Sequence, residues 1–73
     1  MTLKMYAIKD ELNGFAPPIP MANVEVAKRY FREMLQGNNT MKIEPKDFSI
    51  WAMGTFNTET GEMTTEVNLL ERG

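Results

Sequence analysis

The stretch DFSIWAMGTFNTETGEMTTEV, residues 47–67, has the pattern of two β-strands joined by a short loop. Asn57 suits the first position of a type I turn, and Gly61 suits the left-handed position that closes such a loop. This loop predicts that Phe56 lies opposite Met63. Continued without interruption, the same register pairs Gly54 with Thr65, Ala52 with Val67, and Ile50 with Leu69.

This register predicts a hairpin with one apolar face and one mixed face. We expect a helix to cover the apolar face, which consists of Ile50, Ala52, Phe56, Val67 and Leu69. The small residues Ala52 and Gly54 would let that helix approach closely. The only tryptophan of the chain is then expected to point away from the helix. The pairs predicted on that open face are Thr55–Thr64, Met53–Glu66 and Trp51–Asn68.

The segment ANVEVAKRYFREMLQGNN, residues 22–39, is the clearest helix in the chain. Asn23 can cap its beginning by accepting a backbone hydrogen bond. Gly37 suits the left-handed position that follows the end of many helices. Apolar residues recur at helical spacing, which predicts one buried stripe. The stripe consists of Val24, Ala27, Phe31 and Met34, with Tyr30 and Leu35 beside it.

The remaining segments complete the predicted architecture. Residues 3–10 predict a strand, and Asn13 with Gly14 predicts a tight turn. The proline-rich residues 15–22 can form only a short edge strand or an extended connection, because proline donates no backbone hydrogen bond. Residues 38–47 have the composition of a polar loop. We therefore expect one α+β domain over residues 1–73: a small antiparallel β-sheet with one α-helix packed on one face, in the order β-β-α-β-β.

Composition narrows the possible chemistry. The chain has no Cys and no His, so a disulfide is impossible and a zinc site, built mainly from these two residues, is not expected. The usual general base and the best nucleophile of enzymes are absent for the same reason. No carboxylate pair has metal-ligand spacing, and no glycine-rich phosphate-binding loop occurs. We expect no enzyme, no cofactor and no metal.

Charge and length point to a small intracellular binding protein. The formal net charge of −2 does not predict the broad basic surface typical of nucleic-acid-binding proteins. No apolar run approaches the roughly 20 residues of a membrane span, and no signal-peptide pattern occurs, so we expect a soluble protein. A chain of 73 residues has a small core, and such domains often add a partner subunit. We therefore expect a homodimer.

The strand at residues 3–10 contributes to the open face. If its odd-numbered residues join the core, Lys4 and Tyr6 join Trp51 and Met53 outside. An aromatic pair beside a lysine on a sheet can stack unpaired bases. Trp and Met are also enriched in subunit interfaces, so Trp51 and Met53 form a candidate oligomer interface. Ordinary partial burial is a third interpretation. The residues assigned to the core on this view are Leu3, Met5 and Ala7.

Three basic residues on the outer side of the helix are candidate phosphate contacts: Lys28, Arg29 and Arg32. A solvated helix face explains the same residues, with Glu25 and Glu33 pairing with Arg29 at (i, i+4) spacing. We favour the solvated face, because runs of surface charge usually contribute little.

Three segments in order resemble the small nonstructural protein of the gokushoviruses, single-stranded DNA bacteriophages of the Microviridae. They are MYAIKDELNGF (5–15), NVEVAKRYF (23–31) and EPKDFSIWAMGTFNTETGEM (44–63), of which the last is the most specific. Ile50 stands where Leu is usual in the family, and Trp51 where Tyr or Phe is common. The shared positions are Met5, Tyr6 and Ala7; Asn23, Ala27, Arg29 and Phe31; and Pro45, Asp47, Phe48, Ser49, Gly54, Phe56, Thr60, Gly61 and Glu62.

The resemblance implies a nonstructural DNA-binding protein made in the bacterial host cytoplasm. It implies a role in the switch from duplex replication to single-strand synthesis and packaging, and it brings no catalytic residues. We therefore expect binding of single-stranded DNA, with Trp51 and Tyr6 stacking on bases and Lys4, with Arg29 or Arg32, contacting phosphates. The alternative is a protein-interaction factor that acts on the replication initiator, a host replication protein or the procapsid.

Overall fold

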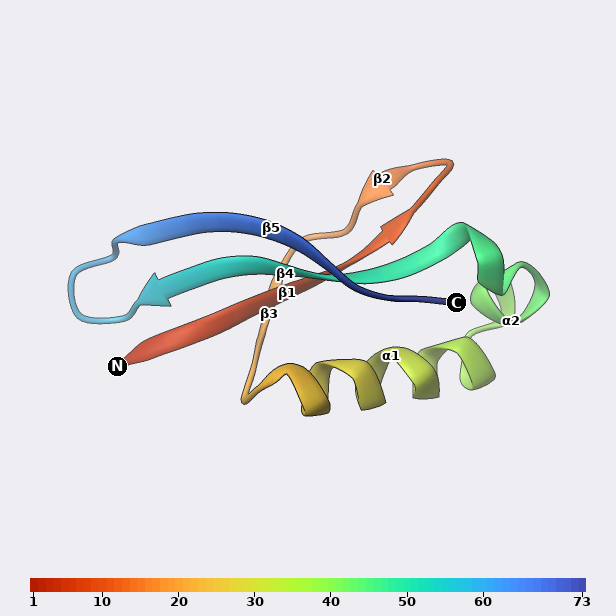
Figure 1. Ribbon diagram of the computed structural model, residues 1–73, viewed down its shortest axis with the longest axis horizontal. Helices are drawn as coiled ribbons and strands as arrows, with labels where there is room; N and C mark the ends of the chain where they lie inside the picture. The colour runs from red at the N-terminus through yellow and green to blue at the C-terminus, as the bar shows by residue number, and fades with distance from the viewer.

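The computed structural model describes residues 1–73 and contains a five-stranded antiparallel sheet with its helices on one side (Figure 1). The sheet order is β2-β1-β4-β5, and β3 pairs with β1 on the same side as β2. The predicted α+β fold is confirmed. The elements are β1 Thr2–Asp10, β2 Gly14–Phe15, β3 Ile19–Met21, α1 Val24–Gly37, α2 Asn39–Ile43, the 3-10 turn Pro45–Asp47, β4 Phe48–Asn57 and β5 Met63–Arg72.

The loop between β4 and β5 has the predicted turn chemistry. The side-chain oxygen of Asn57 accepts hydrogen bonds from the backbone N–H groups of Glu59 and Thr60, at 2.9 and 3.3 Å. Gly61 has a φ of 77°, the left-handed conformation that glycine adopts without strain. The predicted pairs nearest this loop are confirmed: Phe56 with Met63, Thr55 with Thr64, and Gly54 with Thr65.

Farther from the loop, the predicted register is wrong. Ala52 pairs with Asn68 instead of Val67, and Trp51 pairs with Leu69 instead of Asn68. Ile50 pairs with Glu71, because the register shifts a second time beside it. Two neighbouring rows of paired residues show the irregularity: Met5–Gly54–Thr65 and Tyr6–Ala52–Asn68. From one row to the next, β1 advances by one residue, β4 by two and β5 by three. The sheet curves there, and β5 follows the outside of the curve in Figure 1.

The irregularity in β4 is centred on Met53 and Gly54. Met53 is paired with neither neighbouring strand, so the predicted pair with Glu66 is not formed. Gly54 has a φ of 126°, and a Cβ at this position would collide with the carbonyl oxygen of Thr64. The predicted reason for this glycine, close approach of a helix, is therefore wrong. Gly54 allows the bulge and the close approach of β5.

The bulge moves the apolar side of the sheet from one face to the other. On one side of it, Tyr6 pairs with Ala52, and both belong to the helix-covered face. On the other side, Met5 pairs with Gly54 and Leu3 with Phe56. Since neighbours along β1 alternate between faces, Leu3, Met5 and Phe56 lie on the face away from α1. The prediction that Phe56 shares a face with Ile50 and Ala52 is wrong, because one extra residue in a strand reverses the alternation. The helix does not cover Val67 and Leu69 either, since the shifted register pairs Leu69 with Trp51 on the open face.

The hydrophobic core lies between α1 and the half of the sheet in which residues 6–10 of β1 pair with residues 48–52 of β4. Phe31 and Ile50 are completely buried, and Tyr6 is 2% exposed. The expectation that Leu3 and Met5 join this core is therefore wrong, because β1 presents its even-numbered residues to the helix. Ala7 is buried as expected, at 1% exposed, but on the face opposite Tyr6. The buried core residues are Tyr6, Ala27, Phe31, Met41, Phe48 and Ile50.

The ends of α1 are only partly as predicted. Asn23 caps the helix, since its side-chain oxygen accepts a hydrogen bond from the N–H of Val26 at 2.9 Å. Gly37 remains inside the helix, without a left-handed φ, and the extended residue Asn38 ends α1. The same Asn38 caps α2 by accepting from the N–H of Met41. The predicted polar loop is thus a short helix and a 3-10 turn, and Met41 from it is buried.

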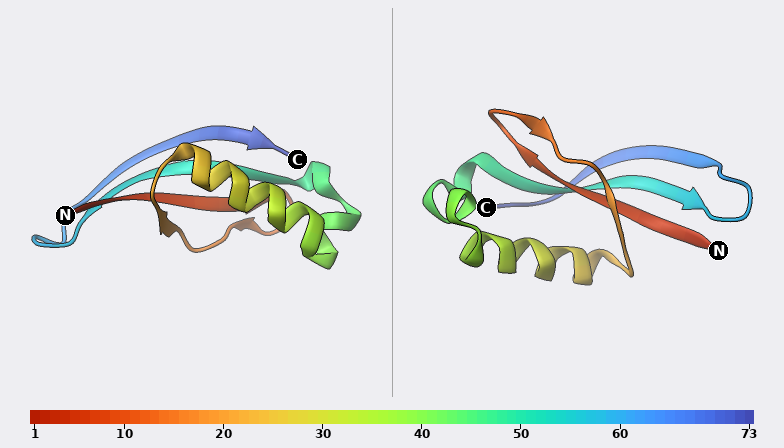
Figure 2. Two further views of the ribbon diagram at one scale, coloured as in Figure 1. Left: turned by 90° about the horizontal axis from the view of Figure 1, so that it is seen from below. Right: turned by 180° about the vertical axis from the view of Figure 1, so that it is seen from behind.

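The helix covers only part of the sheet. In Figure 2, α1 lies against one end, while the start of β1 and the β4–β5 loop extend beyond it. We call this extension the arm: residues 2–5 of β1, 53–57 of β4, 63–67 of β5 and the loop 58–62. The molecule is accordingly elongated, with extents of 41 × 21 × 16 Å. Neither helix has the length and apolar character of a membrane-spanning segment.

Candidate nucleic-acid interface

Trp51 lies on the face of the sheet opposite α1, as predicted. It alternates along β4 with the core residue Ile50, and its ring is half-buried. The indole N–H donates a hydrogen bond to the hydroxyl oxygen of Ser49 at 2.8 Å. The ring of Phe15 packs edge-on against it, with centroids 5.5 Å apart and planes at 75°. This edge-on arrangement is a favourable geometry for two aromatic rings. Trp51 is thus covered in part by β2 and not by the helix.

A basic row runs across the same face beside Trp51. Phe15 of β2 pairs with Lys9 of β1, Lys9 with Ser49 of β4, and Ser49 with Arg72 of β5. The Lys9 ammonium lies 5.5 Å from the Phe15 ring centroid and 5.7 Å from that of Trp51. These distances fit cation–π contacts with both rings. We call these five residues the aromatic–basic cluster.

A tight turn brings Phe15 to this position. The carboxylate of Asp10 accepts hydrogen bonds from the backbone N–H of Leu12 at 2.9 Å and from the side-chain amide of Asn13 at 3.1 Å. Gly14 then takes a φ of 89°, which reverses the chain so that Phe15 pairs with Lys9. The predicted turn at Asn13 and Gly14 is confirmed, and it assembles the cluster.

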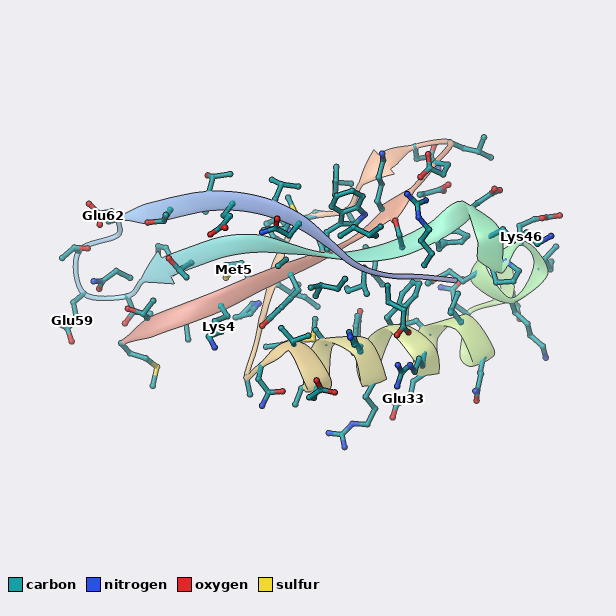
Figure 3. All side chains as sticks on the ribbon, in the orientation of Figure 1. Lys4, Met5, Glu33, Lys46, Glu59 and Glu62 are labelled. Carbon is teal, nitrogen blue, oxygen red and sulfur yellow. The ribbon has the colours of Figure 1, made fainter.

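Two of the predicted binding residues lie elsewhere. Tyr6 is in the core, so the prediction that it stacks beside Trp51 is wrong; burial raises the pKa of its hydroxyl. Lys4 is exposed but belongs to the face that carries Tyr6, and it projects toward the side of α1 in Figure 3. Met53, predicted on the open face, lies at the bulge and is half-buried. Tyr6 and Lys4 are both misplaced because the even-numbered residues of β1 face the helix, whereas the prediction assigned that face to the odd-numbered ones.

The basic residues of α1 do not join the cluster. Arg32 binds the carboxylate of Glu71 on β5 through two hydrogen bonds, of 2.9 Å from Nε and 2.6 Å from its terminal nitrogen. The hydrogen bond from Arg32 lowers the pKa of Glu71. The predicted pairs of Arg29 with Glu25 and Glu33 are not among the ion pairs of the structure. Arg29 is exposed, and Lys28 is half-buried and close enough to Glu71 for its charge to help lower the pKa of that carboxyl.

Sequence reasoning missed four members of the cluster: Phe15, Lys9, Ser49 and Arg72. The signal for Phe15 and Lys9 was present in the turn, because a hairpin closed by Asn13 and Gly14 places these two residues opposite each other. Arg72 carried no such signal. It reaches the level of Ser49 only because β5 gains residues relative to β4 along the curve.

Comparison with known proteins identifies the family. The chain belongs to the phage ORF5 protein family, whose sequence profile matches residues 3–72. No curated protein and no solved structure matches the chain. The protein is therefore a bacteriophage protein, and the match extends over both the aromatic–basic cluster and the arm.

Proposed function

We propose that this phage protein binds single-stranded DNA through the aromatic–basic cluster and thereby modulates viral genome replication or packaging. We assign it, from the motifs, to the nonstructural proteins of gokushoviruses acting in the bacterial host cytoplasm. The observation that carries the proposal is the position of the Lys9 ammonium, within 5.7 Å of the ring centroids of both Phe15 and Trp51. Arg72 shares this open sheet face.

The geometry suits unpaired nucleotides. Bases stack on aromatic side chains whose rings are accessible on a sheet surface, and Phe15 is 43% exposed. Lys9 and Arg72 flank Ser49 and can neutralise phosphates of a strand that crosses the face. A duplex hides the faces of its bases, so the cluster favours single strands. Nearby Glu11, 4.0 Å from the Lys9 ammonium, reduces the local positive charge and favours weak binding.

The proposal predicts a shallow salt dependence. Two cations in the cluster correspond to a slope of roughly −1.4 in log affinity against log salt, at about −0.7 for each phosphate of a single strand. The net charge of −2 adds no general attraction to DNA. Titration with single-stranded and duplex oligonucleotides at two salt concentrations measures both quantities.

Point variants locate the binding site. Replacing Trp51 or Phe15 by Ala should weaken single-strand binding by about 1–3 kcal/mol for each stacked base lost. Lys9→Gln should reduce the salt slope by about 0.7, one phosphate contact. Lys46→Gln is the matched control, because it removes the same charge at an exposed site outside the cluster, as Figure 3 shows. Equal losses for the two lysine variants would reject the cluster as the site.

A second candidate function rests on the arm. Its side away from α1 carries the apolar row Leu3, Phe56 and Met63, which would suit a factor that acts on the replication initiator, a host replication protein or the procapsid. Absence of binding to single-stranded DNA even at low salt would reject the first function in favour of this one.

A further inference from the structure

We infer that the apolar side of the arm is a homodimer interface, on which a second copy of this chain packs face to face and antiparallel. The inference does not depend on DNA binding, because the arm and the aromatic–basic cluster lie at opposite ends of the open face. The residues of this side are Leu3, Met5, Phe56, Met63 and Val67.

The arm has a polarity opposite to that of the rest of the sheet. Its side toward α1 carries the polar residues Lys4, Thr55 and Thr64, which pair with one another across β1, β4 and β5. Its other side carries the apolar row Leu3–Phe56–Met63. The start of α1 reaches the polar side, where Val24 lines a pocket with Lys4 and Thr55, whereas no helix lies over the apolar side in Figure 2. The apolar set therefore cannot be packing for α1, and water contact with it is unfavourable.

The apolar side of the arm is open to solvent, most of all on the edge strand β5. Met63 is 62% exposed and Val67 is 46% exposed, whereas Leu3, Met5 and Phe56 are half-buried. Contiguous apolar surface of this kind marks a contact site. The chain has no Cys for a disulfide and only 8 of its 73 residues are buried, so covering this side with a second copy adds buried apolar area at concentrations where the dimer forms.

The side-chain sizes along the arm fit a second copy. Two adjacent rows cross the three strands: the outer row Leu3–Phe56–Met63 and the inner row Met5–Gly54–Thr65. A two-fold axis perpendicular to the strands, level with Thr55, places the outer row of each copy on the inner row of the other. Phe56 then lies over Gly54, the position on β4 without a side chain. Each contact occurs twice, as a self-complementary interface requires.

This arrangement leaves the cluster accessible. With the strands antiparallel, the two copies extend in opposite directions from the arm, so the two clusters lie at the far ends of the dimer. A dimer that instead overlapped the complete faces would bury both Trp51 rings.

The size of the contact predicts a weak dimer. The arm is three strands wide and about five residues long, which at roughly 4.8 Å between strands and 3.3 Å per residue is a flat face of about 240 Å², and its side chains enlarge the accessible surface. This corresponds to roughly 400 Å² for each partner, below the ~600–1,000 Å² of most stable complexes. We therefore expect a dissociation constant of roughly tens to hundreds of micromolar. At the upper end of this range the dimer is about 100-fold weaker than one with a micromolar dissociation constant.

Sedimentation equilibrium of the full chain between low micromolar and high micromolar concentration tests the inference. The wild type should shift from monomer to dimer mass. Met63→Glu should remain monomeric over the same range, with an unchanged circular dichroism spectrum. Ile43→Glu is the matched control, since Ile43 is 75% exposed on α2, and it should dimerise as the wild type does. A wild type that stays monomeric, or equal effects of the two variants, would overturn the inference.

Cross-linking tests the orientation. The chain lacks Cys, so single thiols can be introduced without background. Met63→Cys mixed with Thr65→Cys should form a mixed disulfide, because these positions face each other across the proposed axis. Met63→Cys mixed with Ile43→Cys should not. Trp51 fluorescence should not change on dimerisation; a concentration-dependent shift would favour complete overlap of the faces and reject the arm-on-arm arrangement.

Discussion

The two ends of the sheet are built from the same three strands and differ in what covers them. At the end beneath α1, Tyr6 and Ile50 face the helix together with Phe31, and all three are buried. In the arm, Phe56 and Met63 face the opposite way, and no element of the chain lies over them. The bulge at Gly54 separates the two ends and reverses the apolar side.

The two ends of the sheet therefore have separate roles: one packs against α1, and the other is free to contact a partner. The covered end holds the fold together and leaves its outer face to polar and aromatic residues, including Lys9 and Trp51. The arm needs no core of its own if a second copy covers it. A sheet that changes its apolar side in mid-strand can therefore serve an internal helix and an external partner without competition between them.

The largest effect should come from truncating the covered core. Phe31→Ala removes a completely buried ring and should lower the free energy of unfolding by about 3–5 kcal/mol. Phe56→Ala should lower the free energy of unfolding by about half as much or less at low micromolar protein concentration, because the Phe56 ring is only half-buried in the monomer. Urea titrations of both variants measure the difference. Equal losses would show that the arm is as tightly packed as the core.

The junction between the two ends should be nearly as sensitive. Gly54→Ala introduces a Cβ that collides with the Thr64 carbonyl, at a φ of 126° that other residues rarely adopt. We expect a loss of about 3 kcal/mol, with hydrogen exchange of arm amides accelerated most. Gly37→Ala is the control: it lies in a helix, has open space around it, and should be neutral or stabilising by up to about 1 kcal/mol.

A smaller effect is expected where α1 begins. Asn23→Ala removes the side-chain oxygen that accepts from the N–H of Val26 and should cost about 1 kcal/mol of folding free energy. Asn23→Ser should recover most of this loss, because serine caps helices well. Since the cap lies beside the arm but supports the covered end, neither variant should change dimerisation. A change in the association constant would link the two ends.

The smallest effect should come from the ion pair between α1 and β5. Arg32 lowers the pKa of Glu71, so the pair stabilises the folded state when the carboxylate is ionised and loses its contribution as the pH falls through the folded pKa. Both side chains reach solvent, so the effect should also weaken with salt. The melting temperature of Glu71→Gln should fall slightly below wild type at pH 7 and equal it in acid. Glu62→Gln, from the exposed loop, supplies the charge-matched control.

Local sequence determined the features that depend on neighbouring residues. The cap at Asn23, the turn at Asn57 and Gly61, and the apolar stripe of the helix all follow from contacts within a few positions, and the α+β class follows from them. The pairs nearest the hairpin loop follow from the loop itself. The family motifs indicated a phage protein, as the match over residues 3–72 shows.

Only the tertiary structure decided which face of β1 meets the helix and which face the residues of the arm occupy. Leu3 and Met5 alternate as regularly as Lys4 and Tyr6 do, so the pattern of β1 alone does not choose the face that meets the helix. The bulge makes β4 use two residues where β1 uses one, which moves Phe56 away from the core, and two register shifts between β4 and β5 bring Arg72 opposite Ser49. A bulge depends on how three strands bend together, and that is a property of the assembled sheet rather than of any single strand.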